Sequence, residues 1–245
     1  MTLAPPACLG LRRSSQRLAG FSLVELLGVL AIIAILSSVA LMAISGLKGS
    51  RELNKAAYDI QGILEQARTL AMASDTYTWV GFFRGIARRP RCRRHGQVVI
   101  AVVPRADGTK LYSALNPSSQ MLLSAAGLTQ AAKLLKIDNL HLDVLGAAAV
   151  PRPSVPAATY QVGSTSFASQ CNFQYPPAAA TPTYTFTRVI QFNPQGDATR
   201  IADSPTQVME IGLRPAHGGT VATASADVAA IQIAGIGGHV TTYYP

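Results

Sequence analysis

Charged residues are scarce in this sequence. Asp, Glu, Lys and Arg make up 13% of the 245 residues, where soluble domains usually carry about 25%. Apolar residues make up 49%, and the mean hydropathy is +0.24. This composition excludes a disordered chain, because such chains are rich in charge and poor in apolar residues. It also argues against an ordinary cytosolic enzyme and points to a part of the chain in a membrane or in a permanent interface.

Cysteine is also scarce, and the residues that form catalytic or metal sites are scattered. Three cysteines are too few for a disulfide-rich scaffold or a four-thiolate zinc site. The four histidines have no HExxH or H-x-x-x-H spacing, and there is no G-x-S-x-G elbow. The scattered aspartates have no D-x-D-x-D spacing, so we expect them to cap turns. We therefore predict no metal site, no cofactor and no enzymatic activity.

The apolar residues gather in one run. Leu26–Leu47 holds 22 consecutive residues without a charge, and about 20 such residues form a helix that spans a bilayer. The segment before it carries Arg12, Arg13 and Arg17 and no acidic residue. By the positive-inside rule these arginines keep the N-terminus in the cytoplasm. The alternative is a secretory signal peptide, but this run is longer than its usual apolar core, and no small-residue cleavage site follows.

One carboxylate lies at the start of this run. Glu25 follows Phe21-Ser22-Leu23-Val24. A carboxylate within the bilayer costs about 2.5–3.5 kcal/mol and therefore suggests a function. The alternative is a glutamate that reaches the headgroup level.

The block G-FSLVELL at residues 20–27 strongly resembles the cleavage signal of type IV pilins and pseudopilins. The resemblance implies that a prepilin peptidase cuts between Gly20 and Phe21 and then N-methylates Phe21. It also implies that Glu25, the fifth residue of the mature chain, pairs with the N-terminal amine of a neighbouring subunit and sets its register. One departure is Met42, where many pilins have a proline that breaks the helix.

Three parts of the chain follow from this. Residues 1–20 are the predicted leader, residues 21–75 a stem helix and residues 76–245 a β-rich periplasmic head. Within the stem, residues 21–47 are predicted to be transmembrane and 48–75 amphipathic. The second half has an apolar stripe at 3–4-residue spacing, formed by Leu53, Ala57, Ile60, Leu64, Ala67 and Ala71. The predicted fold is α+β, with the long helix packed on an antiparallel sheet as in pilins.

Short apolar segments in the head predict its strands, by alternation and β-branched content. These segments are 77–83, 98–103, 110–115, 137–145, 184–193, 206–213, 228–236 and 239–244. A helix is predicted over 120–136 and a turn over 193–196. Loop insertions are predicted at 84–97 and at 146–183, where Arg152 is the one charge. The C-terminal half resembles GspH/FimT-type minor pseudopilins, and DTYTWVGF resembles Verru/Chthon cassette protein D.

The basic residues are as localised as the apolar ones. Residues 84–95 hold six arginines, and with the three of the leader they equal the net charge of +9. These six are Arg84, Arg88, Arg89, Arg91, Arg93 and Arg94. The segment is a solvated hairpin loop, a site for an acidic subunit or anionic membrane, or a site for DNA phosphates. It lacks the interleaved aromatic residues that stack on bases.

Two cysteines remain once the leader with Cys8 is removed. Cys92 and Cys171 would lie in an oxidising compartment, where they either pair in a disulfide or stay as thiols.

The resemblance implies a structural role in a type II secretion pseudopilus or a type IV pilus-like filament. The implied partners are prepilin peptidase, other subunits through the stem helix, an inner-membrane assembly platform and inner-membrane lipid. A DNA-binding minor pilin that uses residues 84–95 is the alternative.

Overall fold

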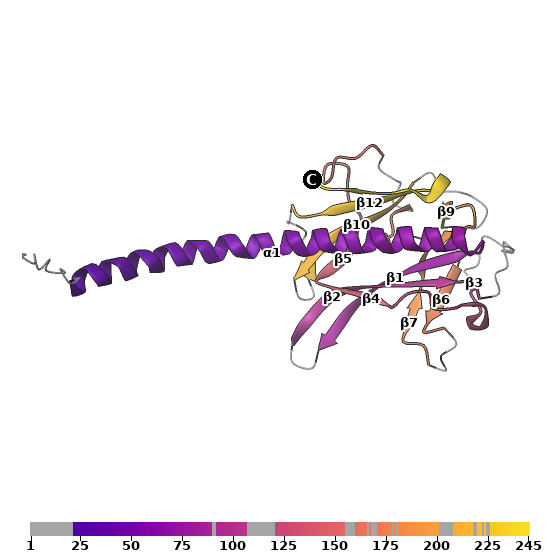
Figure 1. The fold of residues 1–245 in the computed structure, drawn as a ribbon, viewed down its shortest axis with the longest axis horizontal. Coiled ribbons are helices and arrows are strands. Elements are labelled where there is room, and N and C mark those ends of the chain that lie inside the picture. The colour runs from indigo at the N-terminus through magenta and orange to yellow at the C-terminus, as the bar shows by residue number, and fades with distance from the viewer. Residues whose placement is uncertain are drawn as a thin grey trace, which may run out of the picture. The chain divides into compact units, whose positions relative to one another are not determined.

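The computed structural model describes a long helix followed by a β-rich region (Figure 1). The described residues are 22–89, 92–106, 121–154, 160–165, 167, 171–177, 179, 181–200, 208–217, 220, 221, 223 and 226–245; the side chains of 38–49, 86–95, 121, 126, 217 and 220 are excepted. The chain divides into an N-terminal unit, Met1–Gly46, and a C-terminal unit, Leu47–Pro245. The helix α1 (Leu23–Ala73) contributes to both.

In the N-terminal unit, the described apolar side chains of α1 face solvent. The ten large aliphatic side chains between Leu23 and Leu36 are 50–77% exposed. A helix that is apolar on all sides has no hydrophilic face to turn to water. Among the described residues, no helix is long and apolar enough to cross a membrane.

In the C-terminal unit, α1 has one buried face, as the stripe predicted. Ile60, Leu64 and Ala67 are fully buried, and Leu53 is 4% exposed. Their spacing places them on one side of the helix, over the β-sheets, where they form the main core. Glu52, Lys55 and other charged side chains lie on the rest of the helix surface.

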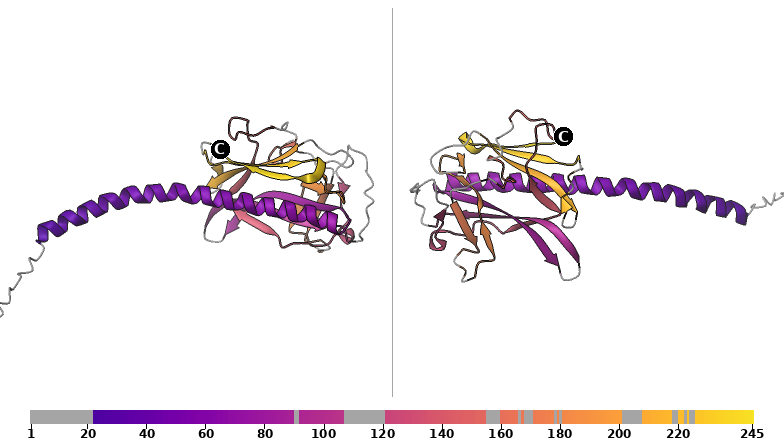
Figure 2. Two further views of the ribbon diagram at one scale, coloured as in Figure 1. Left: turned by 45° about the horizontal axis from the view of Figure 1, so that its top comes forward. Right: turned by 180° about the vertical axis from the view of Figure 1, so that it is seen from behind.

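The strands form two five-stranded sheets and one three-stranded sheet beside this part of α1 (Figure 2). The first sheet has the order β4-β2-β1-β8-β9; the second has the order β11-β10-β12-β13, with β5 also paired to β10; the third has the order β3-β6-β7. The strand bounds are β1 Thr78–Arg89, β2 Cys92–Pro104, β3 Met121–Leu122, β4 Leu135–Asp138, β5 Leu140–Asp143, β6 Cys171–Tyr175, β7 Tyr184–Phe186, β8 Arg188–Phe192, β9 Ala198–Thr199, β10 Val208–His217, β11 Thr220–Val221, β12 Ala229–Ala234 and β13 Val240–Tyr243.

The two faces of β1 belong to two different cores. Val80 and Phe82 point into the main core with α1, whereas Trp79 lies in a second core against β6 and β7. Gly81 makes this close approach possible, because a Cβ there would lie 2.5 Å from Cζ of Phe173. The fold is therefore α+β, with a helix on one face of the first sheet and an aromatic layer on the other.

Asn139 allows one segment to join both large sheets. β4 pairs with β2 in the first sheet, and β5 pairs with β10 in the second. Asn139, between them, has φ 60°, a left-handed conformation that asparagine tolerates better than most residues. The predicted strand 137–145 is therefore two strands in two sheets.

The predicted helix over 120–136 is wrong. The segment contains β3, the short 3-10 turn η1 (Ala125–Gly127) and the start of β4. Its backbone N–H groups pair with other segments, since Leu123 donates to the carbonyl of Asn172 at 2.8 Å and Thr129 to that of Pro104 at 3.0 Å. These bonds bring Leu123 and Leu128 into the second core, so tertiary pairing outweighs the local helix propensity.

Both predicted loop insertions contain ordered structure. Residues 84–89 and 92–97 belong to a long hairpin, because β1 reaches Arg89 and β2 begins at Cys92 with antiparallel pairing between them. Residues 146–183 include β6 and fully buried side chains at Val150, Val162 and Phe173. The many arginines of one segment and the prolines and alanines of the other obscured these patterns.

The C-terminal strand predictions are confirmed. β7, β8, β10, β12 and β13 fall within or overlap the predicted ranges 184–193, 206–213, 228–236 and 239–244. The turn after Asn193 also forms, with Gly196 at φ 88°. The Asp197 carboxylate fastens this turn to the last one by accepting a hydrogen bond from the Gly237 N–H at 2.7 Å. The predicted strand 110–115 lies outside the described residues.

Candidate functional site

The first turn of α1 carries a cap that the sequence analysis did not identify. Oγ of Ser22 accepts a hydrogen bond from the backbone N–H of Glu25 at 3.2 Å. Ser22 and Glu25 have the S-x-x-E spacing of a capping box. That spacing was visible in the sequence and predicts that the helix begins at this point.

Glu25 is the one acidic residue of this first turn. Its side chain is exposed, and within the described part of the chain no ion pair to it is present. A carboxylate at this end of a helix is favoured by the helix dipole. Gly20 and Phe21, as well as Arg12, Arg13 and Arg17, lie outside the described residues.

The arginine-rich segment lies along the β1–β2 hairpin. The backbone positions of Arg88 and Arg89 belong to β1, and those of Arg93 and Arg94 belong to β2. Their side chains, and the whole of Arg91, lie outside the described residues, so anion binding at these positions stays a prediction. Arg84, at the base of the hairpin, is described and exposed.

A second group of basic side chains acts electrostatically on His141, one of the four histidines without metal-site spacing. His141 on β5 pairs directly with Arg214 on β10. Burial and the positive charges of Arg84, Arg188 and Arg214 lower the pKa of His141, while Asp143 opposes this effect. Burial and the charge of Arg84 also lower the pKa of Arg188. No sequence motif indicated this group, because its members come from four separate strands.

A buried ion pair joins segments that are 58 residues apart in the sequence. Arg152 Nε donates to one oxygen of Glu210 at 2.6 Å and its NH2 nitrogen donates to the other at 2.8 Å. Both side chains are 0% exposed. The remaining donors of Arg152 reach the carbonyls of Leu145, Gly146 and Val150, and Gln232 donates to Glu210 at 3.0 Å. This satisfied network fixes the 146–154 segment on the second sheet.

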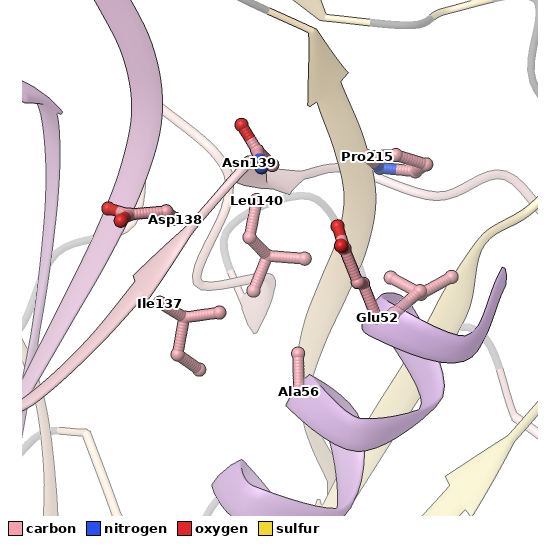
Figure 3. Close-up of a pocket in the computed structure, with 8 residues that line it drawn as sticks. Glu52, Ala56, Ile137, Asp138, Asn139, Leu140 and Pro215 are labelled. Carbon is pink, nitrogen blue, oxygen red and sulfur yellow. The ribbon is translucent and has the colours of Figure 1, made fainter. Parts of the chain in front are cut away.

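Figure 3 shows a small pocket between α1 and the β4–β5 segment. Its volume is about 20 Å³, room for about one water molecule. Glu52 and Ala56 of α1 face Leu140 and Pro215 across it, while the Asp138 carboxylate points away (Figure 3). Asp138 accepts a hydrogen bond from Gln97 at 2.7 Å. In the described part of the chain no group of three His, Cys, Asp or Glu side chains could hold a metal ion.

The two cysteines expected in the mature chain lie in different environments. Cys171 lies on β6 and is buried in the second core. Cys92 begins β2, and its side chain lies outside the described residues. A disulfide between them therefore remains a prediction.

The comparison with protein families bears on the N-terminal end. Residues 16–41 match the family described as the prokaryotic N-terminal methylation motif. The motif is that of type IV pilin-like prepilins and supports the pilin and pseudopilin class. It implies processing by a prepilin peptidase and assembly with other pilin subunits, and it indicates a structural subunit rather than an enzyme. No curated protein and no solved structure matches the chain.

Proposed function

We propose that the chain is a pseudopilin or minor pilin, a structural subunit of a type II secretion pseudopilus or a type IV pilus-like filament. The observation that carries this proposal is the methylation motif over residues 16–41, which includes Gly20, Phe21 and Glu25. The exposed aliphatic side chains between Leu23 and Leu36 support it, because such a surface needs lipid or other apolar helices around it.

In this proposal the residues of the motif act in sequence. Arg12, Arg13 and Arg17 hold the leader on the cytoplasmic side, and the chain is a single-pass inner-membrane precursor with a periplasmic C-terminal unit. Prepilin peptidase cuts after Gly20, where a side chain would crowd the peptide bond, and methylates Phe21. An assembly platform then moves the helix from lipid into a filament.

Glu25 has a specific part in the assembly step. Its carboxylate has no cationic partner among the described residues of its own chain. The carboxylate is therefore available to the N-terminal amine of a neighbouring subunit's Phe21. Two charges that leave water together are tolerated when they are paired, whereas either one alone is costly. The pair therefore favours one register between neighbouring helices.

Processing is tested by two matched glycine variants. Gly20→Leu is expected to accumulate as the full-length precursor on an immunoblot when prepilin peptidase is present. Gly28→Leu is the control, because Gly28 lies in α1 with no atom near the position of an added Cβ, and it is expected to be processed normally. Mature-sized protein from Gly20→Leu would contradict the proposal.

A second candidate function is nucleic-acid binding by a minor pilin of a DNA-uptake machine. One observation favours it: Arg88, Arg89, Arg93 and Arg94 lie on the paired strands β1 and β2, where a loop had been predicted. A two-stranded ribbon fits the major groove of DNA, and clustered arginines attract its phosphates.

The test of this second function is the fluorescence anisotropy of a labelled duplex with the full chain in detergent micelles. Replacement of Arg88, Arg89, Arg93 and Arg94 by serine is expected to abolish salt-dependent binding. Binding that is unchanged by these replacements would exclude this function for the hairpin.

A further inference from the structure

A group of basic side chains lies at the inner end of the arginine-rich hairpin. Arg188 on β8 pairs directly with Phe82 on β1. Arg84 lies two residues after Phe82 on the same strand, so it projects from the same face as Arg188. The two arginines are diagonal neighbours, a separation that long side chains bridge. Two positive charges therefore lie side by side at the end of the first sheet.

His141 and Arg214 add to this group from the second sheet. They are direct cross-strand partners on β5 and β10. Nε of Arg214 donates to the Asp143 carboxylate at 2.7 Å, which compensates one charge. Nδ1 of His141 is buried and has no hydrogen-bond partner. An imidazole nitrogen in this state is a polar group that an additional ligand would satisfy.

The charges around His141 do not balance. The groups that act on it are Arg84 from β1, Arg188 from β8, Arg214 from β10 and Asp143 from β5 itself. Three guanidinium groups and one carboxylate thus act on the ring electrostatically. Arg188 is half-buried, and its NH2 nitrogen donates a long hydrogen bond of 3.4 Å to the carbonyl of Ser164. Arg84 is exposed and open to a ligand.

We propose that Arg84, Arg188 and His141 form an anion site that binds a phosphate group. A guanidinium group binds two phosphate oxygens at once, and charge-assisted bonds of this kind are the strong ones. A doubly charged phosphate matches the two uncompensated arginines, whereas a single carboxylate would neutralise only one of them. The site is separate from the N-terminal motif, so it does not depend on the filament proposal.

Binding of phosphate at this site would be coupled to protonation of His141. Burial, together with the nearby cations, favours the neutral imidazole. An anion held between Arg84 and Arg188 would stabilise the protonated, positively charged ring, both by its negative charge and by accepting a hydrogen bond from the ring. We therefore expect phosphate to raise the pKa of His141 and to bind more tightly at pH 6 than at pH 8.

The test is a histidine-selective NMR titration of the full chain in detergent micelles. Sodium phosphate is compared with sodium chloride at equal ionic strength, and the His141 ring signal is followed between pH 5 and 8. Phosphate is expected to raise the pH at the midpoint of the His141 titration, and this rise should level off at high phosphate concentration. A His141→Asn variant assigns the signal, so the measurement does not depend on filament assembly.

Two variants and a control give the sharpest readout. Arg84→Gln and Arg188→Gln are each expected to weaken phosphate binding roughly tenfold or more, since a hydrogen bond to a charged group contributes about 1.5–3 kcal/mol. Arg51→Gln removes one positive charge from an exposed position of α1 and is expected to leave binding unchanged. Equal loss in all three variants, or a His141 midpoint that phosphate does not move beyond chloride, would overturn the proposal.

A second arm identifies the source of the phosphate. Micelles doped with phosphatidic acid are compared with micelles doped with phosphatidylcholine. A rise in the His141 midpoint with phosphatidic acid supports the site and assigns it to a lipid headgroup, whereas a response to inorganic phosphate alone supports a free phosphate compound. A response to a DNA duplex but to neither of these probes would overturn the site as proposed.

Discussion

The two halves of α1 differ in where their apolar partners are found. Between Leu53 and Ala71 a narrow stripe is 0–4% exposed, because the sheets of the same chain cover it. Between Leu23 and Leu36 the large aliphatic side chains are 50–77% exposed. The described residues of the chain therefore cover one half of the helix and leave the other uncovered.

The charges of the molecule follow the same division. Glu210 is fully buried and receives bonds from Arg152 and Gln232, so its charge is compensated within the C-terminal unit. Glu25 receives no ion pair from the described residues. In the proposed filament, Glu25 would instead find its partner on a neighbouring subunit.

The largest effect on stability is expected when an aspartate is placed in the buried half of α1, and an aspartate in the exposed half is the matched control. Leu64→Asp places an unpaired carboxylate at a fully buried position. It should destabilise the C-terminal unit by more than about 4 kcal/mol, because buried unpaired charges are among the most costly changes. Leu30→Asp changes a side chain that is 54% exposed and should leave that unit folded. Pulse proteolysis in detergent distinguishes the two.

Membrane fractionation completes the comparison. Leu30→Asp should reduce the membrane-bound fraction, since a carboxylate at mid-helix opposes insertion by about 2.5–3.5 kcal/mol. If Leu30→Asp were as protease-sensitive as Leu64→Asp, the two halves would not differ as described.

The second effect concerns the buried ion pair. Glu210→Leu leaves Arg152 buried without its partner, and loss of one member of such a pair usually costs about 3–5 kcal/mol. The double variant Arg152→Leu, Glu210→Leu should recover much of this loss, because it leaves no uncompensated charge. Urea unfolding gives both values. A double variant no more stable than Glu210→Leu alone would indicate that the pair does not act as a unit.

The third effect is on assembly and not on folding. Glu25→Val should be cleaved normally and should keep the urea midpoint of the C-terminal unit. Its incorporation into filaments should fall roughly tenfold, which equals about 1.4 kcal/mol per subunit contact. Shearing and immunoblotting of filaments measure the incorporation. Incorporation equal to that of the unmodified chain would refute the proposed pairing.

The smallest effect is a pH dependence due to His141. Its pKa is lowered in the folded state from the ordinary value of 6.5, so below this value the unfolded chain binds the proton more readily. Stability is therefore unaffected above pH 6.5 and falls as the pH decreases from there to the folded pKa. His141→Asn should show a weaker decrease between pH 7 and 5 in urea unfolding. Identical slopes for the two proteins would contradict this origin.

The sequence predicted those features that depend on periodicity or on a short motif. The stripe on α1, the turn at Asn193 and the C-terminal strands were found because each depends on nearby residues. Residues 120–136 were predicted to be a helix because their composition favours one. Their backbone N–H groups instead form hydrogen bonds to the carbonyls of Pro104 and Asn172, which lie far away in the sequence.

The sites formed by distant residues were not predictable from sequence. The partner of Arg152 lies 58 residues further along the chain, and no spacing rule connects them. The charged residues that act on His141 come from β1, β8 and β10 as well as from β5 itself, strands that belong to two different sheets. The cap at Ser22 was different, because S-x-x-E was visible and was not used.

The most direct test of the central claim is the intact mass and N-terminal sequence of the protein purified from membranes with prepilin peptidase present. The account predicts a chain that begins at Phe21 and carries one added methyl group on its N-terminal nitrogen. A chain that retains residues 1–20, or one cut at another bond, would contradict the proposal that residues 16–41 act as a prepilin signal.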